Sequence, residues 1–376
     1  MRPEGSQPTV TEAVPFVATD AHRLHDPTIE VAWGAPIAMY ECVERGDRIE
    51  AAVRSAPGFE QRPTAERDDA EVDRAIDAVH DPDLREFLAN GWSRFQREAE
   101  PRREVFPDVM LHPAVLHGMD APRRPHDIAG ELGWWCWETN TPIVEGTFDA
   151  ARAAVDVALS TIELVVDGHR LAYGLCRPPG HHAPRAASGG YCYFNNAAIA
   201  ARRAVEAGVG RVAIIDVDYH HGNGSQQIFW DRDDVTYASL HGDPRRAYPY
   251  FCGHRDEIGG PQARGATINR PLPAGTDDAA YAAALAEVLE RVDDRNIDLI
   301  VVSLGVDTTA TDPLGDFRLT PAGLHACGRE IARLGRPMVV LQEGGYDLET
   351  VGDDVVSWLD GASGAARVFP DAHPDR

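Results

Sequence analysis

The sequence contains no lysine: all 36 of its basic residues are arginine, against 60 aspartates and glutamates, and the formal net charge is −24. The absence of lysine excludes every mechanism that depends on a lysine Schiff base, a lysine general base or the lysine of a P-loop. The excess of acid argues against a nucleic-acid partner, because binding to the phosphate backbone requires a basic surface. Any chemistry must therefore rest on other side chains.

The sequence is also poor in cysteine and has no long hydrophobic run. Its six cysteines are scattered and form no CxxC pair, which argues against a disulfide framework and against a zinc finger. No stretch approaches the roughly 18 consecutive apolar residues of a membrane-spanning helix. Residues 1–10 lack the apolar core of a signal peptide. We therefore expect a cytoplasmic protein with no membrane partner.

From about residue 148 onward, helical and strand patterns alternate. The predicted helices are 150–166, 196–207, 225–230, 279–292, 321–334 and a last one from about 348. The predicted strands are 171–176, 211–218, 235–240, 298–307 and 337–342. Continuously apolar strands separated by helices predict a parallel β-sheet with helices on both faces.

The first 147 residues have a less regular pattern. A polar, helix-prone segment at 68–100 leads into an arginine- and proline-rich stretch at 101–125, and the tryptophan-rich GWWCW follows at 133–137. No linker separates this part from the rest, and 43% of all residues are apolar, which is enough for one sizeable core. We expect a single α/β domain over residues 1–376.

Four polar clusters follow predicted strands, where open α/β sheets bind their ligands. In the first, CRPPGHHA, His181 and His182 are adjacent after a rigid Pro-Pro-Gly turn. Two neighbouring histidines can act as a proton-transfer pair, because each can titrate near neutral pH. The alternative is a pair of surface-loop histidines.

The second and third clusters are rich in carboxylates. Asp216, Asp218 and His220 in IIDVDYHHGNG are spaced at i, i+2 and i+4, so they project from one face if the strand persists. Two carboxylates beside an imidazole repel each other unless a cation lies between them, which favours a divalent metal site over a structural hydrogen-bond network. In the third cluster, SLGVDTTATDPLG, the apolar run ends at Asp307, and a buried aspartate there needs a partner such as a metal. A helix N-cap is the alternative for Asp307.

The fourth cluster is QEGGY at 342–346. Its two glycines turn the chain after the last predicted strand and present Tyr346. A phenol at this position can donate a hydrogen bond to a developing oxyanion. Packing of the ring in the core is the alternative.

In this order and with this spacing, the clusters resemble the zinc-dependent deacetylase family, which includes the histone deacetylases and the bacterial acetylpolyamine amidohydrolases. The similarity extends from about His126 to Trp358, and HRLHDP at 22–27 also fits. The resemblance implies the arginase/deacetylase-like fold, a single parallel sheet flanked by helices on both faces. It also implies an amide hydrolysis in which Zn²⁺ makes a water molecule acidic and no covalent intermediate forms.

The resemblance assigns residues to metal ions. A catalytic zinc keeps a position open for water and substrate, and its three protein ligands here would be Asp218, His220 and Asp307. A structural potassium ion would be held, largely through main-chain oxygens, by Asp216, Asp218, His220, Ser239 and Leu240. An arginase-like ureohydrolase with two metals shares the fold but would need more carboxylate ligands than these motifs supply.

The resemblance also implies a role for each histidine of the tandem pair. His181 and His182 would act on the attacking water and on the leaving amine. Asp216 would be the partner of His181, and Asn223 the partner of His182. The neutral amide of Asn223 makes His182 less basic than an aspartate would, so the division of acid and base work stays open.

The remaining residues implied by the resemblance surround the acyl group. Tyr346 would polarise the acyl carbonyl opposite the metal. Gly190 would supply a backbone acceptor, and Tyr191 and Tyr248 would form the two walls of the acyl tunnel.

Within the family, the segments at 239–253, 126–137 and 301–308 look most like the acetylpolyamine branch. In that branch an N-terminal insertion narrows the entrance and helps to build a homodimer, and residues 86–126 match it here. Residues 97–124 carry five arginines and five acidic residues, so this segment gives no strong attraction for a polycation.

The expected function is therefore removal of an acetyl group from a small acetylated amine or polyamine. The alternatives are deacetylation of acetyl-lysine in proteins, deacylation of a specialised metabolite, and non-catalytic binding of acyl-lysine.

Overall fold

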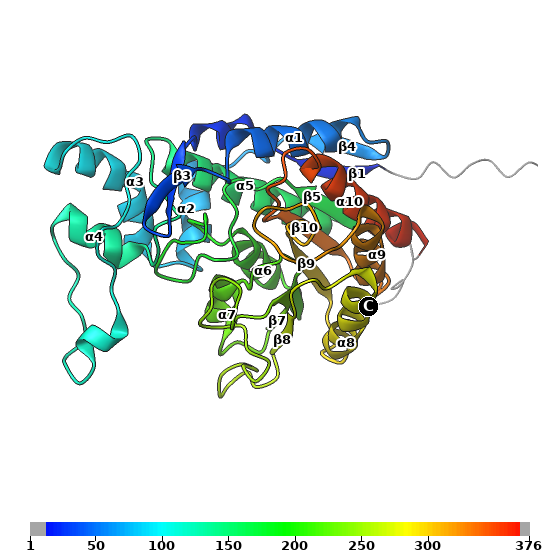
Figure 1. Ribbon diagram of the computed structural model, residues 1–376. Coiled ribbons are helices and arrows are strands. Elements are labelled where there is room, and N and C mark those ends of the chain that lie inside the picture. Colours follow the sequence, from blue (N-terminus) through cyan, green and yellow to red (C-terminus); the bar gives the residue numbers. More distant parts are fainter. Residues whose placement is uncertain (1–12, 369–376) are drawn as a thin grey trace, which may run out of the picture.

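The computed structural model describes residues 13–368, so the expectation for residues 1–10 lies outside the described residues. Eight strands form the central sheet: β1 (Val14–Val17), β4 (Phe59–Arg62), β5 (Leu171–Gly174), β6 (Val212–Asp216), β7 (Val235–Gly242), β8 (Thr267–Leu272), β9 (Leu299–Leu304) and β10 (Met338–Gln342). Their order is β4-β1-β5-β10-β9-β6-β7-β8, and all neighbouring pairs are parallel (Figure 1). This parallel sheet confirms the predicted fold class.

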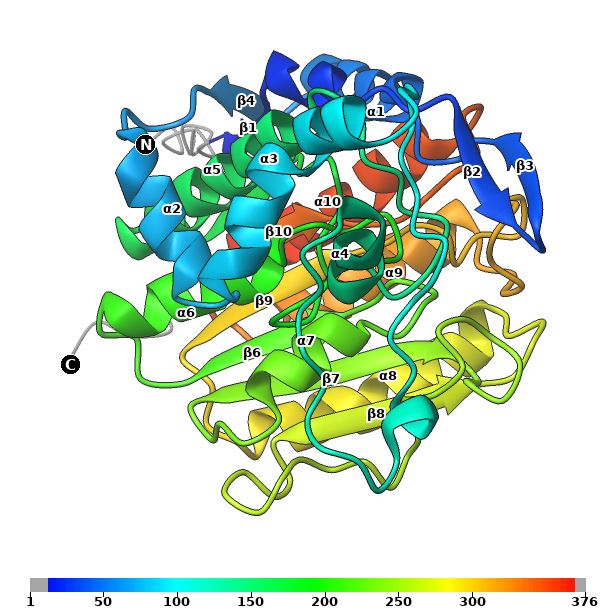
Figure 2. The same ribbon diagram turned by 90° about the vertical axis from the view of Figure 1, so that its left-hand side faces the viewer.

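Helices cover both faces of the sheet (Figure 2). One face carries α5 (Thr147–Val166), α6 (Asn196–Glu206) and α7 (Asn223–Phe229). The other carries α1 (Val43–Ser55), α8 (Asp278–Asp293), α9 (Pro321–Ala332) and α10 (Val351–Val368).

Each face of the sheet has its own hydrophobic core. In β6, Ala213 and Ile215 belong to the core beneath α8–α10, whereas Val212 and Ile214 belong to the core beneath α5 and α6. Successive side chains of a strand point to opposite faces. A strand buried on both sides must therefore be apolar at every position, which is the pattern that the sequence shows.

The N-terminal part adds an outer layer and a hairpin. Helices α2 (Asp69–Asp77), α3 (Pro82–Glu98) and α4 (Ile128–Trp135) lie outside α5, and β2 (Ile29–Ala32) and β3 (Ala35–Ala38) form an antiparallel hairpin. Single 3₁₀ turns occur at Asp20–Leu24 and Pro113–Leu116. The segment between α3 and α4 extends away from the rest of the molecule (Figure 1).

The helix-prone segment at 68–100 is two helices rather than one. Pro82 opens α3, and the side chain of Asp81 accepts a hydrogen bond from the Asp83 backbone N–H at the start of that helix. Proline cannot continue a preceding helix but suits a first turn, so Asp81-Pro82 separates α2 from α3.

Three sheet strands were not predicted, and three predicted strands, β5, β6 and β9, end earlier than predicted. β1 and β4 are too short and β4 too polar to give an apolar pattern, and β8 carries Pro271, which suits an edge strand. β6 ends at Asp216, so the strand itself does not carry Asp218 and His220 on one face.

None of the helices in the described part of the chain has both the length and the apolarity that a membrane crossing needs. All six cysteines lie within residues 13–368 and are free thiols, as the scattered spacing predicted.

Candidate active site

The predicted site residues follow four adjacent strands. His181 and His182 lie in the loop after β5, Asp218 and His220 after β6, Asp307 after β9, and Tyr346 after β10. These strands are neighbours in the order β5-β10-β9-β6. The carboxyl ends of parallel strands lie at one edge of a sheet, so residues that are far apart in sequence come together there.

Asp218, His220 and Asp307 form a compact group of metal-binding atoms. One donor atom from each lies within 4.8 Å of the other two. Nδ1 of His220 is 2.9 Å from Oδ2 of Asp307 and 3.3 Å from Oδ1 of Asp218, and both carboxylates are fully buried. Within residues 13–368 this is the one such group of three or more His, Cys, Asp or Glu side chains.

The charges in this group favour a bound cation. Burial lowers the pKa of His220, but the hydrogen bonds and charges of Asp218 and Asp307 raise it to about 10. Two carboxylates and an imidazole are donors that Zn²⁺ binds, and the low-dielectric surroundings strengthen the attraction for a divalent ion. The residues present therefore fit a zinc ion.

Backbone groups fix the two carboxylates. The Tyr219 N–H donates to Oδ1 of Asp307 at 2.9 Å, and the Gly344 N–H donates to Oδ2 of Asp218 at 2.8 Å. A Cβ on Gly344 would lie 2.6 Å from Oδ2 of Asp218 and 2.7 Å from Oδ2 of Asp307. Only glycine can therefore approach the group so closely at this position.

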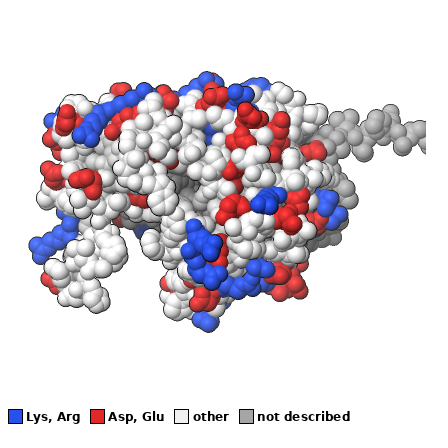
Figure 3. Space-filling model, in the orientation of Figure 1, with Lys and Arg blue, Asp and Glu red and all other residues white. Residues whose placement is uncertain are grey.

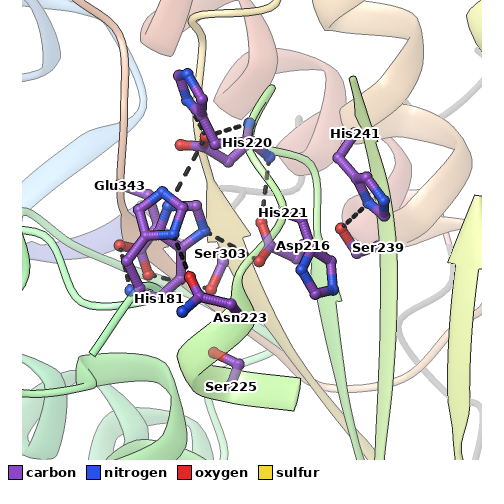
Figure 4. Close-up of polar contacts among 12 residues, drawn as sticks. His181, Asp216, His220, His221, Asn223, Ser225, Ser239, His241, Ser303 and Glu343 are labelled. Atoms are coloured by element: carbon purple, nitrogen blue, oxygen red, sulfur yellow. Dashed lines mark hydrogen bonds and ion pairs between the residues drawn. The ribbon is translucent and has the colours of Figure 1, made fainter. Parts of the chain in front are cut away.

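The tandem histidines are buried beside this group, and their rings are 4.0 Å apart. Nδ1 of His181 is 3.1 Å from Oδ2 of Asp216, a contact that Figure 4 shows. Nδ1 of His182 is 2.7 Å from Oδ1 of Asn223. The structure thus places both histidines next to the partners that the family resemblance implied.

The two histidines have opposite electrostatic surroundings. Burial lowers the pKa of His181, but the charges of Asp218, Asp216 and Glu343 raise it to about 10. Burial, reinforced by the charges of His181 and His220, holds the pKa of His182 well below its usual range. Without a bound metal, the first imidazole is therefore cationic and the second neutral at neutral pH.

Glu343 is a buried site residue that the sequence analysis did not single out. Its Oε2 accepts hydrogen bonds from the backbone N–H groups of Gly180 and His181 at 2.6 and 3.1 Å, and its Oε1 accepts one from Ser303 (Figure 4). Burial raises its pKa to about 7. The sequence could have indicated this residue, because a glutamate directly after the apolar strand β10 is unusual. In the structure, the side chain of Glu343 joins the histidine loop to the sheet.

Tyr346 and His220 both line a cavity of about 700 Å³. Its backbone N–H donates to Oδ2 of Asp312 at 2.6 Å, and the guanidinium of Arg45 lies 5.2 Å from its ring centre. Burial raises the pKa of Tyr346 well above its usual value, so the phenol stays protonated.

Tyr191 and Tyr248 also line the cavity. The ring of Tyr191 is 5.7 Å from that of Tyr346, and the ring of Tyr248 packs edge-on against His182 at 5.0 Å. Gly190 adopts φ 59°, and a Cβ there would lie 2.4 Å from Cδ2 of His182, so this position also requires glycine. The predicted site residues that line the cavity are His182, Gly190, Tyr191, His220, Tyr248 and Tyr346.

Of the residues predicted for a potassium site, His220 lines the cavity, whereas Asp216, Asp218, Ser239 and Leu240 are buried and do not line it. Asp216 and Ser239 are paired neighbours in β6 and β7, and Leu240 follows in β7. Ser239 Oγ lies 2.8 Å from Nδ1 of His241 (Figure 4). Ser239 and Leu240 are fully buried.

The mouth of the cavity is lined by the β2–β3 hairpin, including Glu30 and Trp33, and by Arg246 and Asp316 from two later loops. Figure 3 shows a hollow on this face with basic side chains below it. None of the residues that line the cavity comes from 86–126. The sequence analysis missed these mouth residues because they lie on loops and a short hairpin without a motif.

The fold and the site define a hydrolase of the deacetylase type. Residues 39–361 match the histone deacetylase domain family, and the chain belongs to that family, whose members are zinc-dependent deacetylases. The resemblance found in the sequence is thereby confirmed.

Individual relatives are similar over nearly the whole chain. An acetylpolyamine amidohydrolase of Mycoplana ramosa is 38% identical over 93% of this chain and 99% of its own length. Acetylpolyamine amidohydrolase 1 of Pseudomonas aeruginosa is 41% identical over 93% of this chain and 99% of its own. The crystal structure of an acetylpolyamine aminohydrolase from Burkholderia pseudomallei superposes with a TM-score of 0.87 at 33% identity, covering 94% of this chain and 99% of that one.

Proposed function

We propose that this deacetylase hydrolyses the acetyl amide of small acetylated amines, with acetylpolyamines among its substrates. The observation that carries the proposal is the group of Asp218, His220 and Asp307, whose His220 lines a cavity together with Tyr191 and Tyr248. A cavity with aromatic walls fits a methylene chain, and relatives that match nearly the whole chain are named acetylpolyamine amidohydrolases. We take residues 1–376 as a single domain.

In this mechanism Asp218, His220 and Asp307 hold Zn²⁺. When bound, the ion supplies Lewis acidity toward the acyl carbonyl and toward water. The remaining work is done by side chains of the chain itself.

His182 moves the proton. An amide oxygen only accepts hydrogen bonds, so the contact with Oδ1 of Asn223 places the hydrogen of His182 on Nδ1 and leaves the lone pair on Nε2. The neutral imidazole accepts a proton from the attacking water at Nε2 and returns it to the departing amine.

His181 lies beside His182, and its ring is cationic in the metal-free site. Its Nδ1–H donates to Asp216, which fixes the ring, and the imidazolium stabilises negative charge that develops on the acyl group. A cation held by Asp218 cancels part of that carboxylate's charge and so lowers the pKa of His181 from its metal-free value.

Tyr346 and Gly190 orient the amide. The protonated phenol of Tyr346 donates a hydrogen bond to the carbonyl oxygen as it becomes negative. The carbonyl of Gly190 accepts a hydrogen bond from the substrate N–H, and the rings of Tyr191 and Tyr248 exclude water from the acyl chain.

A substrate panel tests the proposed function. We expect the zinc-loaded enzyme to release acetate from N-acetylputrescine and N-acetylspermidine with a higher kcat/KM than from an acetyl-lysine peptide, because loops and the hairpin close around the mouth. Acetate release can be followed by a coupled assay. Rapid cleavage of the peptide without cleavage of either polyamine would support a protein deacetylase instead.

The chain also has an apolar surface suited to a second copy. Four apolar side chains of the segment between α3 and α4 are strongly exposed: Val109 (71%), Leu111 (47%), Val115 (73%) and Met119 (69%). Exposed apolar patches mark interaction sites. We propose that this segment forms a homodimer contact, through which residues 86–126 shape the entrance of the partner copy.

Light scattering tests the dimer. We expect the mass of two 41.0 kDa chains for the wild type and of one chain for Val115→Glu combined with Met119→Glu. Val166→Glu, at an exposed apolar position outside the segment, is the matched control and should stay dimeric. A monomeric wild type at micromolar concentration would contradict the proposal.

We further propose that Asp216, Asp218, His220, Ser239 and Leu240 bind K⁺. The paired positions of Asp216 and Ser239 in adjacent buried strands, with the charge of Asp216 beside them, support this assignment. Stability that is equal in KCl and in a tetramethylammonium salt would contradict it.

We place the protein in the cytoplasm. Six free thiols, four of them buried, are typical of a reducing compartment. Fractionation of cells that express the protein tests this location, and recovery outside the cytoplasm would exclude it.

A further inference from the structure

Two side chains of opposite charge at the mouth of the cavity lack ion-pair partners. Arg246 follows β7 and Asp316 precedes α9, and both are exposed and line the cavity. Within residues 13–368, neither side chain forms an ion pair, with each other or with a third group. The neighbouring Arg245 instead binds Asp243, with Nε 3.0 Å from Oδ1.

Asp316 is tied to the floor of the site. The preceding residue, Gly315, lies against the metal-binding group, because a Cβ there would overlap the main-chain oxygen of Asp307 and lie 3.4 Å from Cγ of Tyr219. The ring of Tyr219 packs edge-on against the ring of His220 at 4.9 Å. Asp316 therefore holds its charge at a defined position relative to the metal-binding group.

The other carboxylate of the mouth, Glu30, is a weaker charge. It is 2% exposed, and burial raises its pKa to about 7, so a large fraction is neutral near pH 7. The remaining mouth residues include the aromatic side chains of Trp33, Tyr40 and Tyr250. Besides Glu30, the cavity lining near the mouth thus offers one guanidinium, of Arg246, and one carboxylate, of Asp316.

A substrate with a single charge at its far end can pair with only one of these two groups. A polycation meets the like charge of Arg246, and a simple carboxylate meets the like charge of Asp316. A head group that carries both an ammonium and a carboxylate satisfies both, and guanidinium–carboxylate pairs are among the stronger charge-assisted hydrogen bonds.

On the basis of the proposed function, we propose that the mouth selects N-ω-acetylated α-amino acids, with free Nε-acetyl-lysine as the representative substrate. Arg246 binds the α-carboxylate and Asp316 binds the α-ammonium. In the reaction, the oxygen of water bonds to the acyl carbon, the C–N bond breaks, and a proton passes to the amine. The products are acetate and the free amino acid.

Three substrates of equal chain length test this inference without any variant. Nε-acetyl-lysine carries both charges, N-acetylcadaverine lacks the carboxylate, and 6-acetamidohexanoate lacks the ammonium. We expect kcat/KM for Nε-acetyl-lysine to exceed that of each of the others by about tenfold, as expected for one lost charged hydrogen bond.

Two variants test which side chain binds each charge of the substrate. Arg246→Gln should lower kcat/KM for Nε-acetyl-lysine about tenfold and raise it for N-acetylcadaverine, because a like charge is removed. Asp316→Asn should lower kcat/KM for both of these substrates and raise it for 6-acetamidohexanoate. Arg245→Gln, which removes a neighbouring arginine that does not line the cavity, is the matched control and should keep the wild-type order.

Failure of this inference and failure of the proposed function give different results. Equal kcat/KM values for the three compounds in the wild type, or an unchanged order in Arg246→Gln, would overturn this inference and leave the deacetylase function standing. No acetate release from any of the three by zinc-loaded enzyme would overturn the proposed function and this inference with it.

Discussion

Replacing Asp307 by asparagine is expected to lower kcat/KM by roughly 10³-fold or more, because zinc-assisted hydrolysis needs the ion to make water acidic at neutral pH. Asparagine keeps the shape of the side chain but removes one of the two charges that hold the ion. Oδ2 of Asp307 is 2.9 Å from Nδ1 of His220, so the substitution acts within the metal-binding group itself. Zinc content per chain and acetate release from N-acetylputrescine are the two measurements.

Removal of zinc from the wild-type enzyme by a strong chelator should also abolish its activity. Added Zn²⁺ should restore it. Because an ion that binds only the folded state stabilises it, Zn²⁺ should also raise the melting temperature of the wild type, and do so less for Asp307→Asn.

Asp353→Asn is the control for this experiment. Asp353 is exposed on α10 and does not line the cavity, so both its zinc content and its activity should match the wild type. A preparation shown to be free of metal that still cleaves N-acetylputrescine at the wild-type rate would disprove the mechanism.

The Tyr346→Phe variant is expected to lower kcat by about 10²- to 10³-fold, the usual cost of losing one oxyanion donor. Zinc content and KM should change little, because the substitution removes only the hydroxyl. The ring keeps its contacts with Tyr191 at 5.7 Å and with the guanidinium of Arg45 at 5.2 Å, so the loop should hold its position.

Tyr281→Phe is the matched control, because it removes a tyrosine hydroxyl outside the active site. Tyr281 is buried on α8 and does not line the active-site cavity, so its variant should keep the wild-type kcat. Steady-state kinetics together with metal analysis separate the two cases. If kcat of Tyr346→Phe stayed within threefold of the wild type, the phenol could not be the oxyanion donor.

Five strands of the C-terminal part, β5, β6, β7, β9 and β10, were predictable because each is buried on both faces. Such strands stay apolar at every position, as in β6 and β9, and α8 lies within one residue of its predicted ends. The edge strands β4 and β8 were not predictable in this way. An edge strand is exposed along one side, so polar residues such as those of Phe59–Arg62 are tolerated there.

The sequence by itself determined the chemistry: the absence of lysine, the tandem histidines, the carboxylates after two apolar strands, and the tyrosine after the double glycine. These follow from residue type and local spacing. Only the tertiary structure decided which of them meet. His220 and Asp307 are 87 positions apart, and they are in contact because β6 and β9 are neighbours in the sheet.

The mouth of the cavity depends even more on tertiary structure. Glu30, Arg246 and Asp316 belong to three segments with no shared motif, and their placement around one opening follows from how the hairpin and two loops pack over the ends of the strands. Loop packing depends on long-range contacts and leaves no periodic pattern in the sequence. The local sequence therefore predicts the residues of the reaction. The fold determines which charged side chains lie near the far end of the substrate.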